Sequence, residues 1–321
     1  QTKASAERVW FEDIIPEMRR LESLYAGVIG ADDDEVALTP SVSTGLSSLA
    51  SCIDFADRNE ILLSRREFPT DCHVWLAQER RGATVVWIEG KDERAYAAAI
   101  TPRTAVVSAS RVSYLDGAML DPVALGDACR DAGAFYVLDD FHGSGVVPLD
   151  VHATAAHALV SGPLKYLLGG PGVAFVYVRR DVAPFAFDNS AVDWPDTAQR
   201  LALGTPAPAA IFAAAAGLDI ILEVGVERIR ERTLELTTYA IDRAIAEGYD
   251  VRTPRDPVRR GALVAFEVAE SKKVLEALLD AGIIVDERHG ALRVCPHFYS
   301  SEDDLEALFD GLRRMGAGPG R

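Results

Sequence analysis

The chain has 321 residues, of which 49% are hydrophobic and 26% charged, with a formal net charge of −16 and a pI near 4.8. This acidic balance argues against nucleic acid or an anionic membrane surface as a partner, and no apolar run approaches the roughly 20 residues that span a bilayer. Cys52, Cys72, Cys129 and Cys295 are widely spaced without a CxxC pair, so we expect no disulfide framework and no metal site. The N-terminus is polar and does not resemble a signal peptide, and we therefore expect a cytoplasmic protein.

Hydrophobic periodicity predicts strands and helices that alternate along the chain. The expected helices cover 4–28, 39–55, 70–81, 122–132, 207–222, 224–247, 270–281 and 301–314, and the expected strands cover 36–38, 60–64, 84–88, 105–109, 134–138, 157–160, 173–178, 262–266, 283–285 and 292–294. This alternation is typical of an α/β fold with a parallel sheet.

We expect two domains, a large one over 30–223 and a smaller α/β domain over 224–321. Helix 4–28 would be an N-terminal segment that packs near the small domain. The segment 184–197 is expected to be irregular, and the glycine-rich tail 316–321 is expected to be disordered.

Hydroxyl side chains follow the first predicted strand where a helix opens. Ser43 and Thr44 could be ordinary N-terminal caps of that helix. A helix N-terminus also presents free N–H groups and a positive dipole end, so the same residues could hold a phosphate. The residues alone leave both interpretations open.

An acid and a lysine follow two successive strands. Asp139 ends the strand over 134–138, and Lys165 comes shortly after the next strand, in a stretch without any other charge from His157 to Val178. Ligands of open α/β sheets bind beyond the carboxyl ends of the strands, and apolar surroundings lower the pKa of a lysine, which suits it to form a Schiff base. Pyridoxal phosphate (PLP) needs this pair, because a carboxylate keeps its pyridine nitrogen protonated and a lysine holds its aldehyde.

Two segments around these residues resemble the class V aminotransferase-fold PLP enzymes. One runs from Leu138 to His142 and on through 145–151, and the other is the glycine-rich loop 165–172. That group includes cysteine desulfurases, kynureninases and isopenicillin-N-epimerase-like proteins. The resemblance implies a PLP-dependent transferase fold of type I, with a mainly parallel sheet of the seven-stranded type in the large domain.

The same resemblance implies roles around the cofactor. Lys165 would form the Schiff base and move the Cα proton, Asp139 would pair with the ring nitrogen, and His142 would bond the ring hydroxyl. Ser43 and Thr44 fall where the family holds the PLP phosphate.

Four further positions match family motifs. Phe68, in a Phe-Pro-Thr-Asp segment similar to one in kynureninases, would stack on the PLP ring, although it could be a core aromatic before a helix. Ser113 stands where relatives place a residue near the cofactor. Thr205, in a Gly-Thr-Pro segment, would reach the cofactor phosphate of the partner in a homodimer. Arg293 lies in a segment similar to the family's C-terminal signature, where a bidentate guanidinium clamps the substrate carboxylate; the alternative is an ion pair with Asp286 or Glu287.

The reaction is less determined than the cofactor. No cysteine stands in an expected mobile loop, which argues against a cysteine desulfurase, whereas the kynureninase-like segment favours a lyase that cleaves a C–S or C–C bond at the β or γ carbon of a small amino acid. An aminotransferase or an epimerase is the alternative, and a catalytically silent PLP-fold binding protein is another. A dinucleotide-binding enzyme is disfavoured, because no G-x-G-x-x-G follows the first strand.

Overall fold

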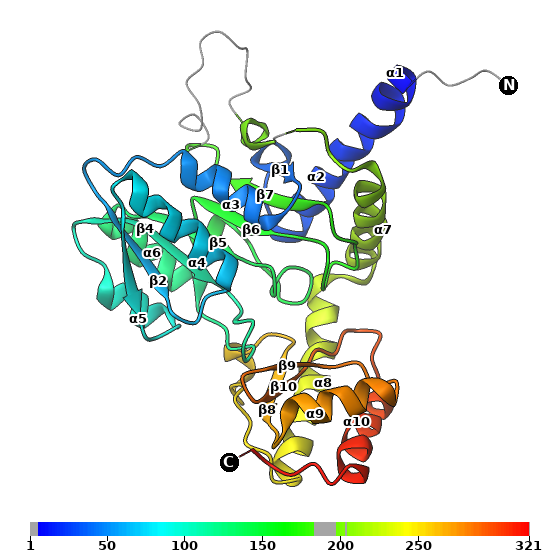
Figure 1. The fold of residues 1–321 in the computed structure, drawn as a ribbon. Helices are drawn as coiled ribbons and strands as arrows, with labels where there is room; N and C mark the ends of the chain where they lie inside the picture. Colours follow the sequence, from blue (N-terminus) through cyan, green and yellow to red (C-terminus); the bar gives the residue numbers. More distant parts are fainter. Residues whose placement is uncertain (1–5, 183–196, 203, 321) are drawn as a thin grey trace, which may run out of the picture.

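The large domain is built on a sheet of seven strands (Figure 1). In the computed structural model, which describes residues 6–182, 197–202 and 204–320, the strands are β1 (Val36–Thr39), β2 (Glu60–Ser64), β3 (Thr84–Ile88), β4 (Thr104–Ser110), β5 (Phe135–Asp139), β6 (Ala158–Ser161) and β7 (Ala174–Val178). They lie in the order β1-β7-β6-β5-β4-β2-β3, and within this sheet only β7 runs against its neighbours. The predicted α/β fold with a mainly parallel sheet is confirmed.

Helices cover both faces of this sheet, as strands with two buried faces require. One face packs against α2 (Ile15–Ile29), α5 (Glu93–Ala99), α6 (Pro122–Ala132) and α7 (Pro208–Val224). The opposite face packs against α3 (Val42–Ser51) and α4 (Pro69–Leu76). Tyr136 faces the first core and Val137 the second, so successive residues of β5 point to opposite sides of the sheet.

The small domain has a sheet of its own. It consists of β8 (Val264–Glu267), β9 (Asp286–Arg288) and β10 (Ala291–Val294), which pair antiparallel in the order β8-β10-β9. Its core is completed by α8 (Val226–Ala246), α9 (Ser271–Asp280) and α10 (Glu302–Arg314). Figure 1 shows this unit joined to the large domain through α8.

Helices α7 and α8 meet at Gly225 with a bend of 82°. The first residues of α8, Val226 and Ile229, still pack in the large-domain core, while Leu236 and Ile241 pack in the small-domain core. Of the helices within the described ranges, none is by itself long and apolar enough to cross a membrane; this bent pair passes by length and composition only.

The N-terminal helix packs where we did not expect it. The short helix α1 (Ala6–Val9), a π-helical turn (Trp10–Ile14) and α2 follow one another, and α2 lies against α7 and β1 of the large domain rather than near the small domain. The reason is the apolar face of α2, where Tyr25 stacks on Phe175 of β7 with ring centroids 4.0 Å apart.

Smaller expectations are also corrected. Residues 283–285 form no strand, and Ile284 is 88% exposed; helix α5 was not predicted. The tail is ordered up to residue 320, because Ala269 N–H donates to Gly318 (3.0 Å) and Gly320 N–H donates to Glu267 (3.3 Å) beside β8. Residues 183–196 lie outside the described residues, so the expected irregular segment 184–197 is not tested.

Candidate functional site

A cavity of about 290 Å³ opens at the carboxyl ends of the parallel strands, next to the starts of α3 and α4. Asp139 ends β5 and pairs in register with Val160 of β6, so the loop that follows β6 and carries Lys165 leaves the sheet beside it. The cavity is lined by Pro40, Ser41, Val42, Ser43, Phe68, Thr70, Asp71, Asp139, Phe141, His142, Leu164, Lys165, Pro171, Gly172, Val173 and Ala174. Five predicted site residues, Ser43, Phe68, Asp139, His142 and Lys165, are therefore brought together.

The N-terminus of α3 forms one wall. Ser41 is its N-cap, and its Oγ accepts a hydrogen bond from the N–H of Thr44 (3.1 Å) and lies 2.9 Å from the Thr44 hydroxyl. Ser43 lines the cavity, whereas Thr44 does not and is held by Ser41. A Cβ at Gly45 would lie 2.4 Å from Val176, so glycine is needed where α3 approaches β7. The free N–H groups at this helix start suit an anion.

The Asp139 carboxylate is buried beside a second acid. Its Oδ1 accepts a hydrogen bond from the Phe141 N–H (2.8 Å), and its Oδ2 lies 3.4 Å from the Ser110 hydroxyl. Burial raises the pKa of Asp139, and burial together with the Asp139 charge raises the pKa of Asp71 well above its ordinary value. Two neighbouring acids cannot both ionise easily, so the Asp71 carboxyl group favours its protonated form and donates a hydrogen bond to Asp139.

Lys165 and His142 face each other. Lys165 Nζ lies 2.5 Å from His142 Nε2 and 4.9 Å from the centroid of the Phe141 ring. Burial lowers the pKa of Lys165, and burial followed by the Lys165 charge lowers the pKa of His142 well below its ordinary value. The imidazole is therefore neutral and accepts from the lysine.

Apolar side chains surround these polar groups. Phe68 precedes α4, remains 40% exposed, and its ring meets the edge of Tyr114 at a centroid distance of 5.3 Å. Leu164, which precedes the lysine, is 52% exposed and lines the cavity. Phe68 is thus not a core aromatic, and its ring is available to a planar ligand.

The acid next to Asp139 points the other way. Asp140 is fully buried on the α2 side of the sheet, where Arg111 binds both of its oxygens at 2.5 and 3.0 Å. The Ser144 hydroxyl donates to it at 2.8 Å, and the Tyr25 hydroxyl lies 3.0 Å from Ser144. Arg111 also donates to the carbonyls of residues 147 and 148, so the ion pair holds the loop after β5 in place.

Arg293 of β10 comes from the small domain. Its guanidinium binds Asp286 and the carbonyl of Tyr114, and its side chain is only 10% exposed. Its Nε is buried without a hydrogen-bond partner among the described residues. Arg293 does not line the cavity, yet its charge contributes to the lowered pKa of both Lys165 and His142, so it lies close to them. The ion pair with Asp286 that the sequence left open is thus formed.

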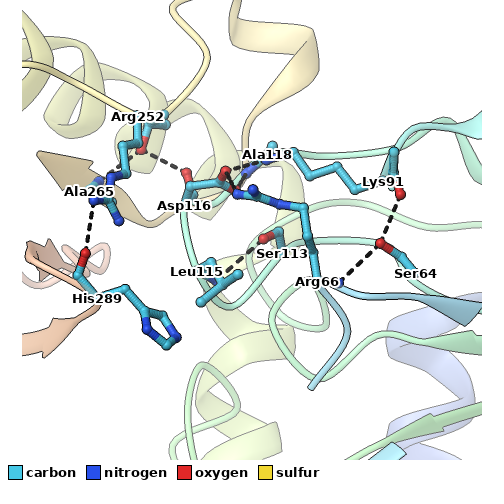
Figure 2. Close-up of polar contacts among 12 residues, drawn as sticks. Ser64, Arg66, Lys91, Ser113, Leu115, Asp116, Ala118, Arg252, Ala265 and His289 are labelled. Atoms are coloured by element: carbon cyan, nitrogen blue, oxygen red, sulfur yellow. Dashed lines mark hydrogen bonds and ion pairs between the residues drawn. The ribbon is translucent and has the colours of Figure 1, made fainter. Parts of the chain in front are cut away.

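Ser113 is not brought to the cavity. It is buried in the turn after β4, where its Oγ accepts from the Leu115 N–H at 3.3 Å (Figure 2). The next acid, Asp116, binds Arg66 and Lys91, and its carbonyl accepts from the Thr253 hydroxyl at 2.7 Å. The turn therefore joins the loop after β2 to the small domain, and its role is structural.

Thr205 also lies away from the cavity and is exposed. Among the residues that sequence reasoning missed, Ser41 could have been found as a serine three positions before Thr44 at a helix start. Asp71 closes the Phe-Pro-Thr-Asp segment, but the sequence alone assigned it no role in the site. Its place beside Asp139 could not be found, because α4 and β5 are brought together only by the fold.

The family profile described as "Aminotransferase class-V" matches residues 9–306. The chain is 30% identical to the "Uncharacterized aminotransferase YcbU" of Bacillus subtilis over 90% of this chain and 81% of that protein, and 31% identical to a kynureninase of Burkholderia mallei over 92% and 78%. Among solved structures, a variant of the protein C-DES with glycine covalently linked to its PLP cofactor has a TM-score of 0.88 at 18% identity, covering 96% of this chain and 87% of that one. A cysteine desulfurase of Thermococcus onnurineus has a TM-score of 0.85 at 20% identity over 95% and 84%.

Proposed function

Because this chain belongs to the class V aminotransferase family, whose cofactor is PLP, we propose that it is a PLP-dependent lyase that cleaves a C–S or C–C bond at the β or γ carbon of a small amino acid. The observation that carries the proposal is the cavity wall formed by Phe68, Thr70 and Asp71. This segment resembles the kynureninases, and a kynureninase is one of the relatives that match the chain.

The donors of the cavity suit PLP. The N-terminus of α3 with Ser43 offers N–H groups and a hydroxyl to the phosphate, Lys165 offers an amine to the aldehyde, and Asp139 offers a carboxylate to the ring nitrogen. When bound, PLP supplies an electron sink for the electrons of the bond that breaks. Phe68 supplies an aromatic face for the ring.

Lys165 also serves as the base at the substrate Cα. Burial lowers the pKa of Lys165 and so makes the neutral amine, which a proton acceptor requires, more accessible. The neutral His142 imidazole, 2.5 Å away, orients the amine and accepts a hydrogen bond from it. His142 would turn to the ring hydroxyl once Lys165 holds the aldehyde.

Arg293 binds the substrate carboxylate. Its guanidinium is already placed by Asp286 and the Tyr114 carbonyl, and its Nε, which has no hydrogen-bond partner among the described residues, can donate to one further acceptor. A bidentate carboxylate would take the place of Asp286, whose side chain is 40% exposed and can turn to water or to Arg288.

A homodimer is part of the proposal. Phe212 and Ile220 are 47% and 45% exposed on α7, so the outer surface of that helix is apolar. Thr205 precedes α7 and is exposed outside the cavity of its own chain, where it could reach the site of a partner. In a two-fold dimer this contact would be made twice.

The test uses amino acids with a leaving group on Cβ, mixed with the PLP-loaded protein without a 2-keto acid. A lyase that eliminates this leaving group releases pyruvate and ammonia while the visible absorption band of the bound cofactor persists. A transaminase instead loses that band as the cofactor is converted to its amino form, and regains it only when a 2-keto acid is added. The second outcome would replace our proposal.

Aminotransfer remains the second candidate, since the YcbU protein is named an aminotransferase and matches 90% of the chain. Leu164 argues for the lyase, because an uncharged side chain beside Lys165 keeps the cavity drier and aminotransfer requires hydrolysis. An epimerase would give a third result: loss of optical activity of the amino acid without ammonia.

A further inference from the structure

A third carboxyl group lies behind Asp139, and the reaction described above does not use it. Glu67 is in the loop between β2 and α4, directly before Phe68, and is only 7% exposed. No arginine or lysine among the described residues binds it. Its partners are hydroxyl and N–H groups, and one of them leads to Asp139.

Three hydrogen bonds reach the Glu67 carboxyl group, and two more fix the Tyr96 hydroxyl that makes one of them. The Tyr96 hydroxyl lies 2.6 Å from Glu67 Oε1, and it lies 3.1 Å from the carbonyl of Ser108 and 3.2 Å from the N–H of Ser64. The Ser110 N–H donates to Glu67 Oε2 at 3.1 Å, and the Ser110 hydroxyl donates to the same oxygen. Both oxygens of the Glu67 carboxyl group are therefore held by hydrogen bonds.

Ser110 stands between two acids but has a single hydroxyl hydrogen. Its Oγ is in close contact with Glu67 Oε2, whereas its distance to Asp139 Oδ2 is 3.4 Å, at the limit of a hydrogen bond. The hydrogen therefore goes to Glu67. As a result Asp139 receives no strong hydrogen bond from the Ser110 hydroxyl, and its carboxylate remains able to pair with a cation bound in the cavity.

Glu67 can accept the hydrogen bond from the Ser110 hydroxyl in either of its protonation states. When ionised, it accepts from Tyr96 and Ser110. When protonated, it donates to Tyr96, which then donates to Ser108, and its other oxygen still accepts from Ser110. Burial raises the pKa of Glu67, and the titratable groups that face it are Asp71, Cys72, Tyr96, Tyr114, Tyr136 and Asp139.

We propose that Glu67 is a positioning residue for the cofactor, which holds the Ser110 hydroxyl hydrogen away from Asp139 so that Asp139 pairs with the protonated ring nitrogen of PLP. Without Glu67, the Ser110 hydroxyl turns to Asp139 and stabilises its charge. The ring nitrogen then gains less from Asp139, and PLP binds less tightly.

The test compares variants of nearly equal side-chain length. Glu67→Gln can place its carbonyl towards Ser110 and its amide N–H groups towards Tyr96, whereas Glu67→Met accepts no strong hydrogen bond. We expect Glu67→Met to bind PLP about tenfold more weakly and to shift the pH midpoint of the visible cofactor band, while Glu67→Gln stays within about twofold of the native protein. Glu60→Gln, at the far end of β2, is the matched control and should leave both quantities unchanged.

A second-site variant separates this role from a structural one. Ser110→Ala removes the hydroxyl that Glu67 holds, so it should leave PLP affinity close to native and should restore the affinity of Glu67→Met in the double variant. If Glu67→Met does not fold, Glu67→Ala is measured instead, both alone and combined with Ser110→Ala. A double variant that binds PLP no better than its Glu67 single variant, or a Glu67→Gln as weak as Glu67→Met, would overturn the proposal. These PLP measurements do not depend on which substrate bond is cleaved.

Discussion

Two adjacent acids at the end of β5, Asp139 and Asp140, lie on opposite faces of the sheet and have opposite electrostatic surroundings. On the α2 side, Asp140 has a bidentate partner in Arg111 and a hydroxyl donor in Ser144. On the α4 side, no arginine among the described residues binds Asp139, and the acid beside it, Asp71, has a pKa raised well above its ordinary value. Adjacent residues of a strand point to opposite faces, so one sequence step separates a neutralised acid from one whose charge is available.

The two acids therefore have different roles: Asp140 stabilises the loop, and Asp139 belongs to the candidate site. The Arg111–Asp140 pair is satisfied within the chain and holds the loop that carries His142. The Asp139 carboxylate faces a cavity and has no ion-pair partner among the described residues, and the pKa values of Asp71, His142 and Lys165 are all shifted in the direction that favours their neutral forms. Perturbed groups that converge on one cavity are typical of functional sites.

The largest effect is expected from Lys165→Ala. It removes the amine on the Asp139 side, so the visible band of the bound cofactor and all turnover should be lost, as absorption spectra and product assays would show. Lys272→Ala, an exposed lysine of α9, is the control and should keep the band. A Lys165→Ala protein that retained the band would remove Lys165 from the proposed role.

Arg111→Met should remove the ion pair with Asp140 on the α2 face of the sheet. It leaves Asp140 buried without its cation, and the free energy of unfolding in urea should fall by roughly 3–5 kcal/mol. Asp139→Asn is the matched change across the strand and should lower turnover without lowering that free energy, because burial already opposes the Asp139 charge. Equal destabilisation by both variants would contradict the distinction.

Arg293→Ala should weaken amino-acid binding by roughly 2–4 kcal/mol, since the substrate carboxylate loses its guanidinium in a largely buried position. The loss is measured as kcat/KM, or as the affinity for a non-reactive amino acid. Arg288→Ala removes a second arginine that also binds Asp286, and it should have little effect. Comparable losses in both variants would show that the charge, rather than the position of Arg293, is what matters.

The smallest effect concerns a buried acid remote from the cavity. Burial raises the pKa of Glu22 in α2 to about 7 from 4.5. Because the folded-state pKa is the higher one, the stabilisation is present below pH 4.5 and is lost as the pH rises through about 7. Between pH 5 and 8 the native protein should lose roughly 2 kcal/mol relative to Glu22→Gln in urea titrations. The exposed Glu12→Gln is the control, and parallel pH profiles for all three proteins would refute the assignment.

Much of this arrangement could be predicted from residues alone. The strand that ends in Asp139, the isolated Lys165 and the hydroxyl residues at the start of α3 identified one edge of the sheet, because parallel strands bring their carboxyl ends together. The family resemblance, rather than the residues alone, added Phe68 and His142, which line the same cavity. Ser113 was placed there by motif and is instead turned into its own loop.

The sequence by itself determined the alternation of strands and helices, and hence the parallel sheet and the edge at which its chemistry lies, since periodicity and strand ends are local properties. Only the tertiary structure decided which acids meet. Asp71 and Glu67 lie 68 and 72 residues before Asp139 in the chain, and they reach it because α4 packs on the face of the sheet that Asp139 points to and Ser110 ends the neighbouring strand β4. The packing of α2 on β7 and the pairing of Arg293 with Asp286 were likewise decided by which surfaces were left to be covered, and no local pattern encodes that.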